Sequence, residues 1–368
     1  MLRSMYSGIS GMKVNQTKLD VIGNNIANVS TTGFKASTAR FSDMLYQNTS
    51  SATAPTSVLG GTNAKQVGLG AQLSSINKVM GQGNALSTGR SLDVCVDGDG
   101  YIMVSKGPEV YVGDDAATSG IGIDASGKLS GGGENEIVYT RDGNLTLDKD
   151  GNLLTADGHR VMGYLLQDGD SGNPSIKWTD VTSGATTTKE GIANYVDADS
   201  KNLKAVGDGA QLYTLKIPDT VKGYPLGADG KPDTGKDPID IPVKSFSIGK
   251  DGVITAVLGD GSRTALGQVA MASFKNPEGL ESVGGNLLQS SPNSGPEMIK
   301  TPTGKLKDGY SDNSKGFGSL IAGALEASNV DLTEQFTDMI TATRAFQASS
   351  KMISTGDEIL QTITNLMR

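Results

Sequence analysis

The sequence predicts a mainly β protein whose two ends form α-helices that pair as a coiled coil, and three observations predict this fold. Apolar residues recur every seven positions near both ends of the chain. Between the ends, short runs of alternating apolar and polar residues are separated by Asp-Gly dipeptides. The 368 residues include 50 glycines and only 5% aromatic residues, which favours short strands and tight turns. We therefore expect one or two β-rich domains, barrel-like or sandwich-like, beside a terminal helix pair.

The first predicted helix covers residues 1–28. Its seven-residue row consists of Met5, Met12, Leu19 and Ile26. Leu2 and Ile9 add the partner positions of the heptad, but Gln16 and Gly23 then fall where apolar residues would be expected. The helix should end near Asn28, because residues 29–33 combine β-branched residues, small polar residues and a glycine.

The second predicted helix lies at the C-terminus and repeats the pattern more strongly. Its seven-residue row is Leu332, Met339, Phe346, Ile353, Leu360 and Met367. Phe336 supplies one apolar partner position, and the others are polar: Thr343, Ser350, Asp357 and Thr364. Asp331 can cap this helix, with Glu334 at the spacing of a capping box. The pattern favours a coiled-coil seam over the alternative, a pair of ordinary helices packed on a globular core.

The segment that follows the first helix predicts an extended linker over residues 30–75. Residues 37–65 are rich in Ser, Thr, Ala, Asn and Gly and have few large apolar side chains. Such a segment cannot bury enough surface to fold by itself, so we expect it to become ordered only against neighbours.

The middle of the chain predicts compact β modules. Residues 92–96, 101–104, 144–148 and 253–258 alternate as strands do, and Asp-Gly pairs such as those at 142–143, 157–158 and 251–252 lie between such runs. The stretch 168–240 is more polar and reads as a second, outer β domain inserted in an inner one, which comprises residues 76–167 and 241–319. The helical domain then comprises residues 1–29 and 320–368.

Charge and cysteine content exclude several classes of protein. The net charge is −8 and the isoelectric point is about 4.8, so nucleic acid and anionic membrane surfaces are poor partners. No apolar run is long enough to span a membrane, and the N-terminus lacks the pattern of a cleaved signal peptide. The single cysteine, Cys95, cannot form an intramolecular disulfide; a buried strand residue is the default, and a reactive crosslinking thiol is the alternative.

The candidate chemical motifs do not assemble into a site. His159 is the only histidine and has no nucleophile motif beside it, so we read it as a surface residue in a turn. One histidine and one cysteine cannot supply a standard zinc site. The run that starts at Asp148 resembles a calcium loop, but Leu153 and His159 occupy the positions that need glycine and glutamate. We therefore predict no catalytic, cofactor-binding or metal-binding residues.

Distinctive blocks lie near both ends of the chain: Ser7-Gly8-Ile9-Ser10-Gly11-Met12, Asn24-Asn25-Ile26-Ala27-Asn28, Thr32-Gly33-Phe34-Lys35, Ser328-Asn329-Val330-Asp331-Leu332 and residues 344–351. These blocks resemble the axial proteins of the bacterial flagellum, the family of rod and hook subunits. Internal blocks at residues 92–101, 139–161 and 266–280 are similar as well, whereas 168–240 shows no match. The blocks occur in the family's order and cover both ends and most of the first β domain.

The resemblance implies a self-assembling structural protein and not an enzyme. Identical subunits would form a flexible helical tube that acts as a universal joint between motor and filament. Its other partners would be the distal rod, hook-cap and hook–filament junction proteins and the export apparatus. The subunit would be extracellular, exported unfolded through the central channel by a type III route without a cleaved signal peptide. Rod subunits are generally shorter, so the length favours a hook subunit, with the distal rod protein as the alternative.

The residues expected to form the assembly interface are the two seven-residue rows: Met5, Met12, Leu19, Ile26, Leu332, Met339, Phe346, Ile353 and Leu360. A more remote alternative is a secreted β-domain binding module or a hydrolase flanked by oligomerising helices. A pocket with convergent polar groups would distinguish that class. A calcium-dependent surface protein would instead show metal-dependent stability.

Overall fold

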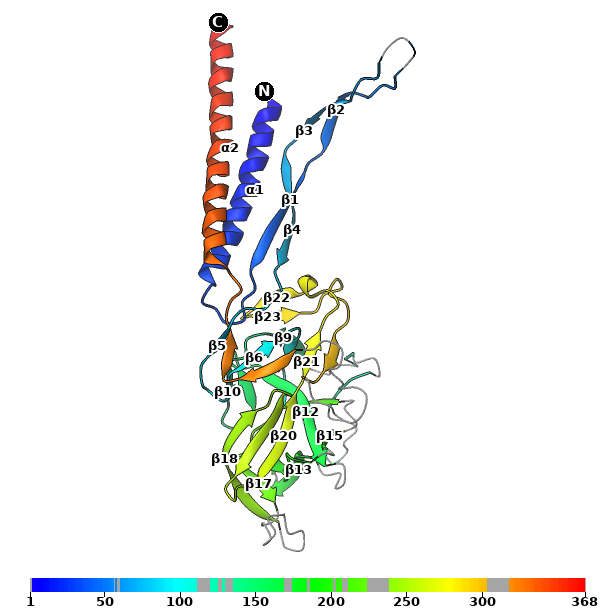
Figure 1. The fold of residues 1–368 in the computed structure, drawn as a ribbon, viewed down its shortest axis with the longest axis vertical. Coiled ribbons are helices and arrows are strands. Elements are labelled where there is room, and N and C mark those ends of the chain that lie inside the picture. The colour runs from blue at the N-terminus through cyan, green and yellow to red at the C-terminus, as the bar shows by residue number, and fades with distance from the viewer. Residues whose placement is uncertain are drawn as a thin grey trace. The chain divides into compact units, whose positions relative to one another are not determined.

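A computed structural model describes residues 2–55, 57, 60–110, 120–124, 128–129, 135–168, 174–183, 186–200, 203–206, 211–223, 238–302 and 318–367. The chain divides into two compact units (Figure 1). The first unit contains Met1–Thr31, Lys35–Gly81 and Ser328–Arg368, and the second contains Thr32–Phe34 and Gln82–Ala327. The protein is mainly β with a helix at each end, as the sequence predicts.

The first unit is built on the two terminal helices, α1 (Leu2–Ala27) and α2 (Leu332–Leu366). The carboxylate of Asp331 caps α2 by accepting hydrogen bonds from the backbone amides of Thr333 and Glu334, at 2.8 and 3.3 Å. This confirms Asp331 as the capping residue. Helix α2 begins at Leu332, after the strands β25 (Ser319–Ala322) and β26 (Ala324–Glu326) of the second unit and a short connecting segment.

The segment expected to be an extended linker contains four paired strands. They are β1 (Ser37–Asp43), β2 (Tyr46–Ser50), β3 (Lys65–Gly68) and β4 (Ala71–Lys78). Strand β1 pairs antiparallel with β4, and β2 pairs with β3. Mutual pairing satisfies the backbone groups of strands that have little to bury. The β1–β4 pair also packs against α1, so it forms part of the helical unit.

Among the described residues, the second unit contains the remaining strands and the short 3₁₀ helix η2. They are β5 (Ala85–Ser87), β6 (Val94–Asp97), β7 (Tyr101–Lys106), β8 (Ile121–Gly122), β9 (Glu136–Thr140), β10 (Leu145–Leu147), β11 (Leu153–Thr155), β12 (Arg160–Asp168), β13 (Ile176–Ser183), β14 (Thr186–Ala193), β15 (Leu203–Ala205), β16 (Gln211–Thr214), β17 (Thr220–Gly223), β18 (Ile239–Ile248), β19 (Val253–Leu258), β20 (Arg263–Val269), β21 (Met271–Ser273), η2 (Pro277–Gly279), β22 (Glu281–Gly284), β23 (Leu287–Gln289), β24 (Met298–Lys300), β25 (Ser319–Ala322) and β26 (Ala324–Glu326). The main sheet runs in the order β17-β18-β19-β20-β12-β7-β9-β23-β22. The pairings along this path are antiparallel.

Strand β7 is buried on both faces of this sheet, which explains its run of apolar residues. Ile102 and Val104 belong to one core cluster, whereas Tyr101 and Met103 belong to another. Successive side chains of a strand point to opposite faces, so one strand serves two cores. In the second cluster, the ring of Phe274 packs edge-on against Tyr139, with ring centroids 4.8 Å apart.

The described residues of 168–240 share the cores of the flanking segments and do not form a separate core of their own. Leu215 and Val221 lie in the same cluster as Ile102, and Leu212 lies in the cluster of Met103. Strand β16 pairs with β12 of the segment before it, and β17 pairs with β18 of the segment after it. Residues 169–173, 184–185, 201–202, 207–210 and 224–237 of this stretch lie outside the described residues.

A buried ion pair ties together the chain segments at which the second unit begins and ends. Arg141 Nη1 lies 3.3 Å from Glu326 Oε1, and both side chains are almost fully buried. The Glu326 carboxylate also accepts a hydrogen bond from the Gly83 amide, and its backbone carbonyl accepts one from Gly33. Arg141 donates in addition to the Gly100 carbonyl. The pair therefore fixes three distant parts of the sequence at one point.

Candidate assembly interface

Helices α1 and α2 lie side by side and run in opposite directions (Figure 1). Gly356 lies against Met5, and Gly8 lies against Ile353, so the start of α1 faces the C-terminal part of α2. At the other end of the pair, the Asn25 amide donates to Gln335 Oε1 at 3.0 Å. The order of these contacts defines an antiparallel coiled-coil pair within one subunit.

The structure places most of the nine predicted interface residues along this seam. Partly buried members are Met5, Met12, Leu19, Ile26, Met339, Phe346, Ile353 and Leu360. Leu332 differs, because it is 40% exposed at the start of α2. The two rows therefore pack against each other within one subunit. Part of each side chain remains exposed and available for contact with another subunit.

The second row of the heptad differs from the prediction. The expected partner positions Ile9, Gln16, Gly23, Phe336, Thr343, Ser350, Asp357 and Thr364 are all exposed, and the side chain of Leu2 lies outside the described residues. The row that is buried or partly buried lies three residues after the first one: Gly8, Asn15 and Ile22 on α1, and Gln335, Ala342, Ser349 and Gly356 on α2. Small side chains in this row let the helix backbones approach closely. A search for large apolar residues misses them.

Two asparagine side chains in the terminal motifs bond to the backbone at the start of β1 and just after β4. Asn25 is 1% exposed; its amide group donates to the Ser37 carbonyl at 2.8 Å, and its Oδ1 accepts from the Ser37 amide at 2.9 Å. Asn329 donates to the carbonyls of Val79 and Gly81 and accepts from the Ala36 amide. These structural roles give a physical reason for asparagine at both positions, which sequence reasoning did not identify.

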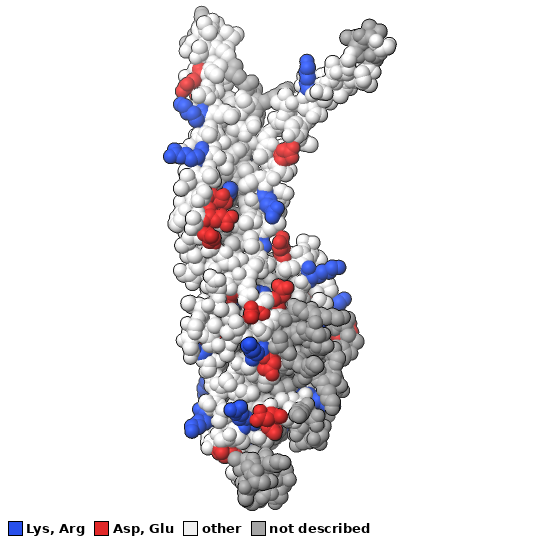
Figure 2. Space-filling model, in the orientation of Figure 1, with Lys and Arg blue, Asp and Glu red and all other residues white. Residues whose placement is uncertain are grey.

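Helix α2 presents apolar side chains that the first unit covers only in part. Met352, Ile359 and Leu366 are at least half exposed and follow one another at seven-residue spacing. Ile363 and Met367 continue the seam beyond the point where Met5 of α1 meets Gly356. Figure 2 shows charged side chains of both signs along the helices, with uncharged side chains between them. Exposed apolar rows of this kind are typical of protein–protein contact surfaces.

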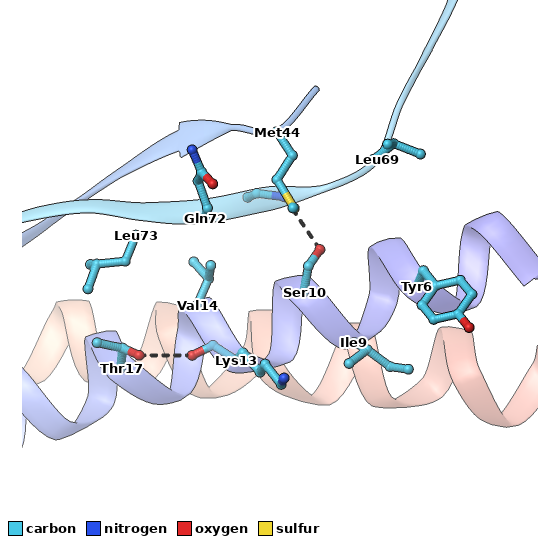
Figure 3. Close-up of a pocket in the computed structure, with 11 residues that line it drawn as sticks. Tyr6, Ile9, Ser10, Lys13, Val14, Thr17, Met44, Leu69, Gln72 and Leu73 are labelled. Carbon is cyan, nitrogen blue, oxygen red and sulfur yellow. Dashed lines mark hydrogen bonds between the residues drawn. The ribbon is translucent and has the colours of Figure 1, made fainter. Parts of the chain in front are cut away.

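A groove lies between α1 and β4 (Figure 3). Its volume is about 550 Å³, and it is lined by Tyr6, Ile9, Ser10, Lys13, Val14, Thr17, Met44, Leu69, Ala71, Gln72 and Leu73. Lys13 is the only charged residue in this lining. The hydroxyls of Ser10 and Thr17 donate to carbonyls of their own helix, at 2.8 and 3.1 Å. The groove thus lacks the convergent polar groups of a catalytic pocket and has the character of a docking surface.

Two other candidate residues, Cys95 and Asp148, have structural surroundings. Cys95 is fully buried in β6, where it pairs with Ile321 of β25. Asp148 accepts hydrogen bonds from the backbone amides of Asp150 and Asn152, so its carboxylate closes a turn. No group of three or more metal-ligating side chains occurs among the described residues. Neither described helix has a stretch apolar enough to cross a membrane.

Three family models match the chain. "Flagella basal body rod protein" matches residues 5–35, which include most of α1. "Flagellar hook protein FlgE/F/G D1 domain" matches residues 129–256. "Flagellar basal body rod FlgEFG protein C-terminal" matches residues 321–366, which include all of α2. The matched regions thus contain the antiparallel helix pair and much of the second unit.

Proteins similar to this chain match it from end to end. Flagellar basal-body rod protein FlgG of Bacillus subtilis is 37% identical over 368 residues, which cover 100% of both chains. Flagellar hook protein FlgE of Treponema pallidum is 31% identical over 476 residues, and FlgE of Borreliella burgdorferi is 28% identical over 479 residues. Both hook alignments also cover 100% of each chain.

Proposed function

Because the chain belongs to the flagellar rod and hook protein family, we propose that it is a subunit of the flagellar rod, of the distal rod type. Proteins of this family are structural, and this chain is a structural protein and not an enzyme. The observation that carries the rod assignment is the 37% identity with a rod protein over the whole of both chains.

The length of the chain does not favour a hook subunit. That expectation assumed that rod subunits are shorter. The FlgG of Bacillus subtilis aligns over 368 residues, the full length of this chain, whereas the two hook alignments extend over 476 and 479 residues. Identity is also lower with the hook proteins. The hook remains the second candidate function, because these relatives also match the whole chain.

Assembly follows from the surfaces of the first unit. Identical subunits that meet through two different surfaces form an open helical polymer. Helix α2 offers Met352, Ile359 and Leu366 for such contacts. Full burial of a side chain of this size contributes about 1.5–3 kcal/mol relative to exposure, so one row can hold two subunits together. The same proposal includes contacts with neighbouring rod, hook-cap or junction proteins. It also includes export through the axial channel to a site outside the cell.

Electron microscopy of the purified full-length chain under assembly conditions tests this function. We expect hollow tubes with straight axes, because a rod is a stiff shaft. Curved tubes would favour the hook assignment instead. A chain that stays monomeric at every concentration tested would contradict both assignments.

A further inference from the structure

We propose that the groove between α1 and β4 of one copy receives the exposed C-terminal part of α2 from a second copy, with the two helices antiparallel. The inference rests on the proposed function, since it specifies how identical subunits meet. The groove and the α2 row both belong to the first unit, and no residue of α2 lines the groove. A second copy can therefore occupy it without displacing the existing helix pair.

The exposed row on α2 is longer than the groove, and both surfaces are mainly apolar. The part of α1 that lines the groove extends from Tyr6 to Thr17, about 16 Å at 1.5 Å per helical residue. The exposed row on α2 extends from Met352 to Leu366, about 21 Å by the same rise. Apolar side chains of α1 and β4, including Val14 and Leu73, reach into the space between helix and strand (Figure 3). An apolar helical row is the kind of element that such a groove binds.

Four exposed charges determine the direction of docking. On α1, Lys13 in the groove lining and Asp20 are seven residues apart, so they lie on the same side of the helix. On α2, Lys351 and Glu358 are also seven residues apart. Within the described residues, none of these four side chains makes an ion pair.

An antiparallel arrangement pairs all four charges at once. When Glu358 of a second copy faces Lys13, its Lys351 faces Asp20, because both separations are about 10.5 Å along the helix axis. A parallel arrangement with the same first pair would place Asn365 opposite Asp20. In the antiparallel register, residues 359–365 face residues 6–12, so Ile359 and Ile363 enter the groove.

The uncovered end of α2 also supports a second copy as the occupant. The α1–α2 seam continues on α2 through Ile363 and Met367, past the start of α1. The same segment carries Ile359 and Leu366 on the adjacent row. The groove of a second copy would therefore cover the C-terminal part of α2. This surface is continuous with the existing α1–α2 interface.

Charge-swapped variants of the full-length chain test the inference. One variant carries Lys13→Asp with Asp20→Lys, and the other carries Lys351→Glu with Glu358→Lys; neither swap changes the net charge. Each variant alone should raise the protein concentration needed for assembly about tenfold or more, because like charges then face each other. Far-UV circular dichroism of the monomers should match that of the unmodified chain.

Two rescue experiments complete the test. The four substitutions combined in one chain should restore assembly. An equimolar mixture of the two swapped chains should also assemble, because the swapped groove of one chain fits the swapped row of the other. The inference is overturned if each swapped chain assembles like the unmodified one, or if neither rescue succeeds. Failure of the unmodified chain to assemble would instead count against the proposed function.

Discussion

Gly8 of α1 lies so close to Ile353 of α2 that a Cβ atom at Gly8 would stand 3.2 Å from Ile353 Cγ1. The reciprocal arrangement occurs at Gly356, where a Cβ would stand 3.3 Å from Met5 Cγ. Ile353 and Met5 thus each pack over a glycine of the opposite helix. The close approach of the two helices depends on the absence of a side chain at these positions.

Gly8→Leu should destabilise the helix pair by about 1–3 kcal/mol, because the added side chain has no space beside Ile353. Urea unfolding followed by the helical circular dichroism signal measures this change. Gly23→Leu is the matched control, since a Cβ at Gly23 meets nothing within 4 Å. Because leucine favours the helix more than glycine does, that variant should gain about 0.5–1 kcal/mol. Equal effects at the two glycines would contradict the close packing.

Asn25→Ala should release β1 from the helix pair. The substitution leaves the Ser37 amide and carbonyl without the side chain that now bonds both, at a cost of about 1–3 kcal/mol. Hydrogen exchange at the Ser37 amide is the measurement, and it should accelerate. Asn24→Ala provides the control, because Asn24 is exposed and its side chain bonds only Asn28 among the described residues. Protection of Ser37 that survives in the Asn25 variant would refute this role.

Arg141→Met should destabilise the second unit by about 3–5 kcal/mol, because it removes one partner of an ion pair whose two side chains are almost fully buried. Adding Glu326→Gln should recover part of that loss, since the neutral amide retains an oxygen that can accept from Gly83. Denaturant unfolding of the two single variants and the double variant measures the coupling. Strictly additive losses would mean that the two side chains do not act as a pair.

The Cys95 thiol should resist alkylation in the folded protein, because the residue is fully buried in β6. Mass spectrometry after iodoacetamide treatment, with and without guanidinium, measures its reactivity. We expect modification only in denaturant. Rapid labelling of the native chain would instead support the reactive, crosslinking thiol.

The sequence alone predicts the helix pair well but only half of its seam. Met339 and Ile353 stand out because large apolar residues repeated at seven-residue spacing are typical of a coiled-coil seam. Ala342, Ser349 and Gly356 do not, because small residues at an interface resemble those on a solvated surface. Their role becomes visible only when the opposite helix supplies the large side chain.

Strands β1 and β4 illustrate why the segment after α1 could not be predicted. Ser37 pairs with Lys78, so each strand depends on a partner far away in the sequence. Neither strand shows a strong alternation of large apolar and polar residues, because much of the strand pair remains exposed. The packing of residues 168–240 could not be predicted for a related reason. Leu215 and Val221 reveal a shared core only through their contacts with the flanking strands.

The central claim is that copies of this chain polymerise through the paired terminal helices. The most direct test compares sedimentation of assembled protein for the unmodified chain, Phe346→Asp and Gln347→Asp. Phe346 lies partly buried on the seam, whereas its neighbour Gln347 is exposed, so the control places the same charge one residue away. We expect the unmodified chain and Gln347→Asp to form sedimenting polymer and Phe346→Asp to remain in the supernatant with its β-strand signal intact. Normal polymer formation by Phe346→Asp would contradict the claim.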